Sequence, residues 1–181
     1  MTDSGISYET LVVDGMIRPD FMDLKMDGRV YKINRETKAV TTMDAGLRFT
    51  NGIAFGPDGS LYANETLTGM VYRYGMKEGR IAGVRESFGN VIDPEGPGGF
   101  HGPDGMAFGE NGHLFVAVYG QGIVTELGPD GSVVRYLPAK GLKPTNVAFG
   151  PRGEKKIYVT EDESGSLDVI DVDTGGFPLF H

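Results

Sequence analysis

One short motif occurs three times in this chain and constrains the fold more than any other feature. Each copy starts with Asn or Asp and continues through apolar residues to an Ala-Phe-Gly sequence. The copies start at Asn51, Asp104 and Asn146. They recur at intervals of roughly 40 to 50 residues, which is the length of one unit in several repeat architectures. The chain is therefore expected to consist of repeated structural units.

The residues that follow each copy also repeat, in a pattern typical of short strands. Second strands are expected at 61–63, 114–118 and 157–159, and third strands at 69–74, 122–127 and 165–170. Fourth strands are expected at 81–88 and 132–137, and an earlier partial unit at 2–5, 28–33 and 39–42. Each unit is a four-stranded antiparallel meander, the blade of a β-propeller. We predict an all-β propeller, with innermost strands at 53–55, 106–108 and 147–149.

The composition agrees with this fold and excludes several function classes. The 29 glycines and 10 prolines among 181 residues favour many short strands joined by tight turns. A formal net charge of -8 without a basic run argues against nucleic-acid binding, and the absence of cysteine excludes disulfides and thiolate metal sites. The chain shows neither a signal-peptide pattern at Met1 nor 18 consecutive apolar residues, so we expect a cytoplasmic protein that does not contact a membrane.

The number of units poses a problem of closure. Propellers close as rings of four to eight blades, and residues 1–181 contain only about three and a half. An open arc leaves sheet faces and edge strands uncovered, which folded proteins normally avoid. Three explanations stay open at this point. The chain is a single propeller domain lacking its N-terminal blades, it pairs with a second copy as a homodimer that completes the ring, or it is a compact four-bladed variant.

The first residues of the three motifs are the candidate functional residues. The innermost strand of each blade lines the central channel, which places Asn51, Asp104 and Asn146 at the channel mouth. Carboxylate and amide oxygens without nearby thiol or paired histidine ligands suit a hard divalent cation, with calcium favoured over magnesium. The alternative is structural, because Asn-Gly and Asp-Gly pairs are common turn formers that need no ligand.

Three further features are weaker candidates. His101 lies in a glycine-rich connection just before Asp104, from which it could reach a substrate. The sequence 119–122 is interpreted as a strand exit that needs glycine rather than a phosphate-binding loop, because no helix follows it. The acidic run 161–163 is interpreted as a solvated loop, with a second calcium site as the alternative.

The order of these motifs resembles a known family. The segments 50–59, 102–106, 119–122, 145–150 and 157–161 are similar to the senescence marker protein, gluconolactonase and luciferin-regenerating-enzyme family. The similarity runs from about Met1 to the C-terminus and implies the C-terminal part of a six-bladed propeller. The resemblance also implies one divalent metal in the channel, held by a Glu from the first blade, an Asn and an Asp.

The resemblance assigns roles to two residues of this chain. Asn51 matches the Asn ligand and Asp104 the Asp ligand, whereas the first-blade Glu and a further channel Asn have no counterpart after Met1. The implied function is metal-dependent hydrolysis of a sugar lactone or a similar small lactone, with the metal polarising the carbonyl and Asp104 transferring the proton. The alternative is a non-catalytic binding or scaffold propeller, or an inactive fragment, because a fold does not dictate chemistry.

Overall fold

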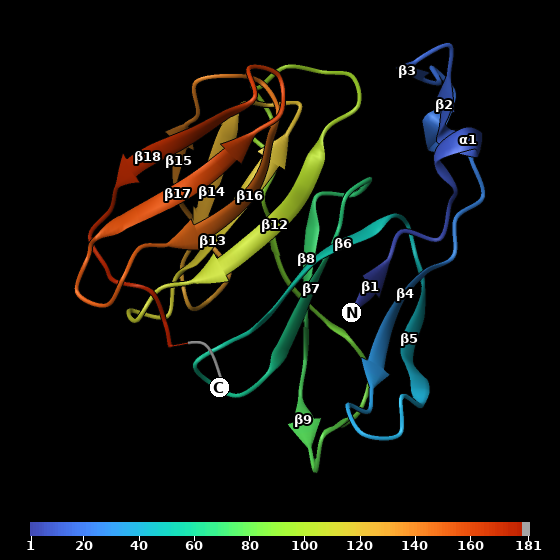
Figure 1. The fold of residues 1–181 in the computed structure, drawn as a ribbon, viewed down its shortest axis with the longest axis vertical. Coiled ribbons are helices and arrows are strands. Elements are labelled where there is room, and N and C mark those ends of the chain that lie inside the picture. Colours follow the sequence, from blue (N-terminus) through green and yellow to red (C-terminus); the bar gives the residue numbers. More distant parts are fainter. Residues whose placement is uncertain (179–181) are drawn as a thin grey trace.

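The computed structural model describes residues 1–178, in which four antiparallel sheets of three or four strands follow one another and two short hairpins lie between their strands (Figure 1). The first sheet contains β1 (Thr2–Asp3), β4 (Gly28–Ile33) and β5 (Val40–Leu47). The second contains β6 (Thr50–Phe55), β7 (Leu61–Glu65), β8 (Met70–Tyr74) and β11 (Glu86–Asn90). The third contains β12 (Gly102–Phe108), β13 (Leu114–Tyr119), β14 (Ile123–Leu127) and β15 (Val133–Pro138). The fourth contains β16 (Pro144–Phe149), β17 (Lys156–Glu161) and β18 (Ser166–Asp171).

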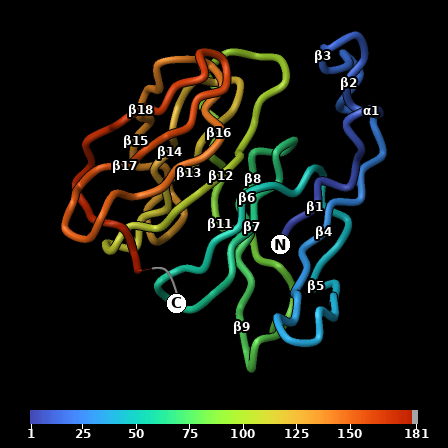
Figure 2. The backbone as a smooth tube through the Cα atoms, in the orientation of Figure 1, coloured from blue at the N-terminus to red at the C-terminus, as the bar shows by residue number. Residues whose placement is uncertain are grey.

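The sheets follow one another in chain order, as the tube in Figure 2 shows. Glycine-containing turns separate most consecutive strands, and neighbouring strands of the blades pair in sequence, so each sheet is a meander. In Figure 1 the first sheet lies at the right, the second in the middle, and the third and fourth at the left. This arrangement confirms the predicted all-β propeller of four-stranded antiparallel blades, with two complete blades and two three-stranded ones in the described residues.

Short elements interrupt the regular blades at two places. Between β1 and β4 the chain forms α1 (Tyr8–Leu11), β2 (Val12–Val13), β3 (Met16–Ile17) and the 3-10 helix η1 (Phe21–Asp23). Between β8 and β11 it forms the hairpin β9 (Met76–Lys77) and β10 (Arg80–Ile81). The prediction of a fourth strand at 81–88 is wrong at its start, because Ile81 belongs to this hairpin. Within the described part of the chain, no helix has the length and apolar character that a bilayer-spanning segment needs.

Strands β6, β12 and β16 are the first strands of their sheets and pack against one another. Each lies at one edge of its sheet, and β12 contacts both β6 and β16. The predicted innermost strands are therefore correct in identity and too short in extent. Because β6 and β12 start before the motif residues, Asn51 and Asp104 lie inside strands rather than ahead of them.

The hydrophobic core consists of three layers, each between two neighbouring sheets. Strands β7 and β13 are buried at nearly every position, so each of the two central sheets buries both of its faces. The layer between the first and second sheets includes Val30, Leu47, Leu61, Ala63 and Tyr74. The layer between the second and third includes Tyr62, Val71, Met106, Phe108, Leu114 and Val116. The layer between the third and fourth includes Phe115, Val124, Val147, Ile157 and Val159.

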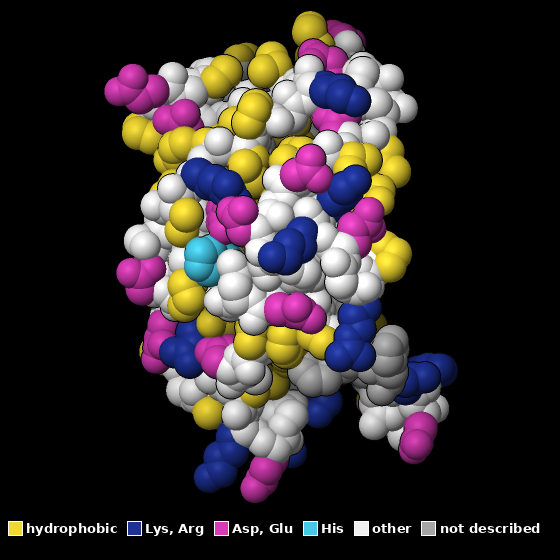
Figure 3. All heavy atoms as spheres, turned by 90° about the vertical axis from the view of Figure 1, so that its left-hand side faces the viewer, with side chains coloured by type: hydrophobic (Ala, Val, Ile, Leu, Met, Phe, Trp, Pro, Cys, Tyr) yellow, Lys and Arg dark blue, Asp and Glu magenta, His cyan; other side chains and the backbone are white. Residues whose placement is uncertain are grey.

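The outer face of the fourth sheet is not covered by another sheet within residues 1–178. Leu167 and Val169 on β18 are 57% and 50% exposed. Figure 3 looks at the molecule from the left-hand side of Figure 1, and there hydrophobic side chains alternate with acidic and basic ones. The molecule thus ends in an open sheet face, as expected for an arc of blades.

Candidate functional site

A β-bulge lies near the start of each inner strand. The pairing register shifts between Thr50 and Ile53 in β6 and between Pro103 and Met106 in β12. In β16 the shift lies between Pro144 and Asn146. An extra residue on one strand turns the local side chains away from the regular alternation, and bulges are common next to functional sites. Asn51 and Asp104 both lie in such a bulge, so the direction of their side chains does not follow the regular alternation between the two faces of the sheet.

The structure brings Asn51 and Asp104 together at one end of the inner strands. The Asn51 side-chain amide donates a hydrogen bond to the Asp104 carboxylate, which also accepts one from the backbone N–H of Gly105. Burial nevertheless raises the pKa of Asp104 to about 6, because desolvation disfavours its charged form more than these hydrogen bonds favour it. None of the ion pairs formed within residues 1–178 includes Asp104.

This environment fits a bound cation. Burying an ionised carboxylate without a cationic partner costs free energy of desolvation, and a bound metal ion offsets this cost. The oxygens of Asn51 and Asp104 belong to the donor class that calcium prefers. Within the described residues, no group of three or more Asp, Glu, His or Cys side chains could hold a metal. The pair therefore suits two positions of a coordination sphere and leaves the others open.

The glycines after Asn51 and Asp104 are required by the approach of neighbouring inner strands. A Cβ added at Gly52 would overlap the carbonyl oxygen of Asp104, and one added at Gly105 would overlap the side-chain amide of Asn146. Neither glycine has a positive φ. The interpretation of these Asn-Gly and Asp-Gly pairs as turn formers is therefore wrong, because they lie within strands at points of close contact.

Two polar side chains that the sequence analysis did not single out hold the site backbone. Asn64 is fully buried; its Oδ1 accepts a hydrogen bond from the Gly52 N–H at 2.9 Å, and its Nδ2 donates to the Asp104 carbonyl at 2.6 Å. In the preceding blade, the Thr2 hydroxyl donates to the Asn51 carbonyl at 2.6 Å. A polar residue inside an apolar second strand is the signal that could have identified Asn64.

Asn146 differs from the other two motif residues. Its side chain is exposed, and its Oδ1 accepts a hydrogen bond from the Val147 N–H at 3.0 Å. The same side chain lies against Gly105, next to Asp104. Asn146 therefore neighbours the site, and its amide oxygen is engaged locally.

Buried polar residues at the ends of the second strands fix the segments that lead into the inner strand of the same sheet. The Glu65 carboxylate accepts hydrogen bonds from the Arg48 N–H and the Tyr72 hydroxyl. The Gln121 amide pairs with both backbone groups of Asp93 at 2.9 and 3.0 Å. Gly120 and Gly122 have positive φ, in keeping with the interpretation of 119–122 as a strand exit.

Glu161 corrects the interpretation of the acidic run 161–163. Its side chain is buried, and it accepts hydrogen bonds from the Ser164 hydroxyl and from the N–H groups of Lys143, Glu163 and Ser164. The bond from the Ser164 hydroxyl contributes most to lowering the pKa of Glu161, which falls to about 2. Glu161 is therefore not solvated, whereas Asp162 and Glu163 are exposed.

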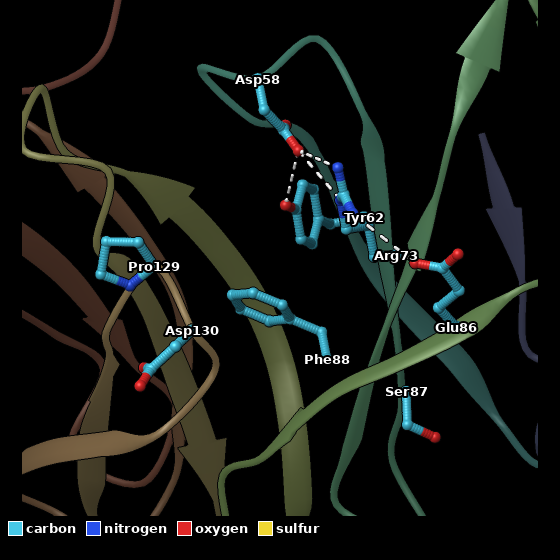
Figure 4. A pocket seen from close by; sticks show the side chains of 8 residues that line it. All are labelled: Asp58, Tyr62, Arg73, Glu86, Ser87, Phe88, Pro129 and Asp130. Carbon is cyan, nitrogen blue, oxygen red and sulfur yellow. Dashed lines mark hydrogen bonds and ion pairs between the residues drawn. The ribbon is translucent and has the colours of Figure 1, made fainter.

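His101 lies outside the Asn51–Asp104 pair. Its Nδ1 is buried without a hydrogen-bond partner, and its side chain lines a cavity of about 430 Å³ with the turn 66–69 and the connection near Ile92. A second cavity, of about 340 Å³, lies at the opposite end of β6 (Figure 4). There Arg73 is ion-paired with Asp58 and Glu86 at 2.8 and 3.5 Å. Neither cavity is lined by Asn51 or Asp104.

Comparison with known proteins shows that the chain is similar to proteins named as lactonases. Pentonolactonase XacC of Haloferax volcanii is 35% identical over 154 residues, which cover 82% of this chain and 50% of that protein. The 6-deoxy-6-sulfogluconolactonase of Pseudomonas putida is 32% identical over 134 residues, covering 74% and 44%. The matched part thus spans about half the length of these relatives.

Solved structures agree on the fold. Regucalcin from Agrobacterium tumefaciens, described as a calcium-binding protein, superposes with a TM-score of 0.69 at 24% identity, covering 83% of this chain and 54% of that one. Luciferin-regenerating enzyme gives a TM-score of 0.71 at 22% identity with the same coverage. Residues 12–162 match the family described as SMP-30/Gluconolactonase/LRE-like region. The chain therefore belongs to the SMP-30/gluconolactonase/LRE-like family.

Proposed function

We propose that this chain is part of a metal-dependent hydrolase that opens a sugar lactone or a similar small lactone. The observation that carries the proposal is the hydrogen-bonded pair of Asn51 and Asp104, a partly buried carboxylate without an ion-pair partner in the described residues. Relatives named as lactonases support the reaction class. A small-molecule lactone is the corresponding partner.

Asn51 and Asp104 would hold one divalent cation, with calcium as the proposed ion. When bound, such a cation supplies Lewis-acid polarisation of the lactone carbonyl. Asp104 accepts the proton of the attacking water at its carboxylate and returns it to the leaving alkoxide, which yields the hydroxy acid. Asn51 orients that carboxylate through its hydrogen bond, and the Gly105 N–H fixes it from the backbone side.

The remaining coordination positions are proposed to come from outside residues 1–181. The chain spans about half the length of its relatives and ends in an open sheet face that exposes Leu167 and Val169. We propose that it forms a single propeller domain that needs further blades for full activity. Blades of a longer polypeptide or a second copy of the chain could supply them. The cytoplasmic location expected from the sequence stays a prediction, which cell fractionation tests.

A non-catalytic binding propeller is the second candidate. It is favoured by the small number of metal donors in the described residues, since no group of three acidic, histidine or cysteine side chains could hold a metal there. In this case the chain would bind a ligand without turning it over, as propellers of unrelated function do.

The test uses the chain itself and a chimera in which it replaces the matching half of the Haloferax pentonolactonase. Calcium affinity is measured by titration calorimetry, and lactone opening by pH-stat with and without chelator. We expect Asp104→Ala to abolish hydrolysis in the chimera. Asn51→Ala should mainly weaken calcium binding and be partly rescued by excess calcium. The matched control is Asn34→Ala, which should change neither property, because this side chain is exposed in the turn after β4 and accepts hydrogen bonds from the N–H groups of Glu36 and Thr37.

Two outcomes would contradict the lactonase proposal. Full activity of the Asp104→Ala chimera would remove Asp104 from the reaction. A folded chimera that binds small lactones and never opens them would favour the binding propeller instead.

A further inference from the structure

An aromatic cluster lies at the same end of the inner strands as Asn51 and Asp104. The Phe100 ring meets the rings of Phe21, Phe49 and Tyr119 edge to face, with centroids 5.2, 6.0 and 6.0 Å away. All four side chains are partly exposed, and none belongs to the three hydrophobic core layers. The cluster is therefore a separate aromatic surface, which the packing of the blades does not require.

Each ring of the cluster comes from a different segment, and two of these segments lead into the site residues. Phe49 precedes Asn51 by two positions, and Phe100 precedes Asp104 by four. Tyr119 ends β13 where that strand pairs with Gly102 at the start of β12. Phe49 and Phe100 thus lie in segments that run directly into the strands bearing Asn51 and Asp104, and Tyr119 lies beside the start of β12.

Two backbone features fix the segments that carry Phe49 and Phe100. Phe49 has a φ of 69°, a left-handed conformation that is unfavourable for a bulky residue. Strained backbone of this kind concentrates at ligand clamps and active sites. Phe100 is held by a close approach, since a Cβ added at Gly120 would overlap the Phe100 carbonyl oxygen. The Phe100 backbone is thus held against Gly120, and its ring is held by the three neighbouring rings.

We propose that Phe100 is a specificity-determining residue whose ring, with those of Phe49 and Tyr119, packs against the apolar face of the lactone. This inference rests on the proposed function and narrows its substrate class from sugar lactones and similar small lactones to small lactones that present an apolar surface. Covering partly exposed aromatic rings with an apolar surface is favourable in free energy. The rings of Phe49 and Phe100 cannot hydrogen-bond a polar substituent. The site should therefore prefer lactones with an apolar substituent or a fused aromatic ring over unsubstituted lactones.

The test measures binding without hydrolysis. Two lactams, one benzo-fused and one unsubstituted six-membered ring, are titrated into the 181-residue chain in calcium buffer and followed by ligand-detected NMR. Phe100→Leu should weaken binding of the benzo-fused lactam about tenfold, the effect of losing about 50 Å² of apolar contact. Binding of the unsubstituted lactam should change less than about twofold, because it covers little of the ring. The matched control is Phe55→Leu at the far end of β6, which should affect neither lactam.

The outcomes separate this inference from the lactonase proposal. Equal weakening of both lactams, no weakening of either, or no binding to the unaltered chain would overturn the role of Phe100. Selective weakening in a protein that opens no lactone would support the aromatic surface and contradict the hydrolase. Circular dichroism of Phe100→Leu checks that the blades are intact before the titrations are compared.

Discussion

The contact between β6 and β12 can be tested with a single methyl group at Gly52. Gly52→Ala places a Cβ against the Asp104 carbonyl oxygen and within 2.6 Å of the Asn64 amide nitrogen. The Asp104 carbonyl is part of the β12 backbone and the Asn64 side chain on β7 is fully buried, so relieving the overlap requires a shift of β12 or β7. Because Gly52 does not have a positive φ, the cost is one of packing and not of backbone conformation.

The expected magnitude follows from what the methyl group displaces. Overpacking a tight interior typically costs about 1–3 kcal/mol. We expect the upper value here, because the obstructing Asp104 oxygen is a backbone atom that cannot rotate away. The displacement also strains the two hydrogen bonds of Asn64, at 2.6 and 2.9 Å. A loss of about 3 kcal/mol lowers the melting temperature by about 6–12 °C in a domain of this size.

The assay is thermal and urea unfolding followed by circular dichroism. Gly98→Ala is the matched control, since a Cβ there meets nothing within 4 Å and φ is not positive, and its stability should change by less than about 0.5 kcal/mol. Gly52→Ala should also weaken calcium binding, because moving β12 carries Asp104 away from Asn51. A variant as stable as Gly98→Ala would refute the claim that the strands touch at Gly52.

Three further predictions concern stability and association. Asn64→Ala leaves the Gly52 N–H and the Asp104 carbonyl unpaired, and urea unfolding should show a loss of about 2–3 kcal/mol; a loss below about 1 kcal/mol would contradict the bridging role. Glu161→Gln should destabilise the chain at pH 7, and the difference should shrink as pH falls from about 4.5 to about 2. The reason is that folding lowers the pKa of this carboxyl group. The ionised group therefore contributes its full stability above the unfolded-state pKa, and this stability is lost as pH falls through the folded-state pKa. A difference independent of pH would exclude the charge as its cause. Because Leu167 and Val169 are exposed on an open sheet, light scattering of the isolated chain should show self-association, and a stable monomer would contradict this.

The sequence predicted those parts of the fold that depend on local pattern. The motif at Asn51, Asp104 and Asn146 repeats together with its turn and apolar strand, so the order of strands in each blade could be read directly. The partial first sheet was also predicted, because β1, β4 and β5 keep the pattern of a blade. The start of β11 was missed because the hairpin β9–β10 has the same strand character as the strand that follows it.

The details of the site depend on contacts between blades, which a local pattern does not contain. The bulges at Asn51 and Asp104 appear only once each strand is paired, and the need for Gly52 and Gly105 arises from the neighbouring inner strand. Asn64 acts across the same interface. Whether Asn51 and Asp104 bind metal and act in catalysis stays a prediction.

The bulges at the starts of β6 and β12 carry the candidate site residues, whereas the regularly paired parts of the same strands form the blade. Regular pairing with β7 and β13 resumes at Ile53 and Met106. The strand pairing beyond these points therefore does not depend on the side chains at Asn51 and Asp104. If Asn51 and Asp104 bind the ligand as proposed, a substitution at either residue changes ligand binding and leaves the apolar layers between the sheets as they are. Selection for a new ligand on this scaffold should therefore accumulate accepted changes at the bulges, and few within the layered interior.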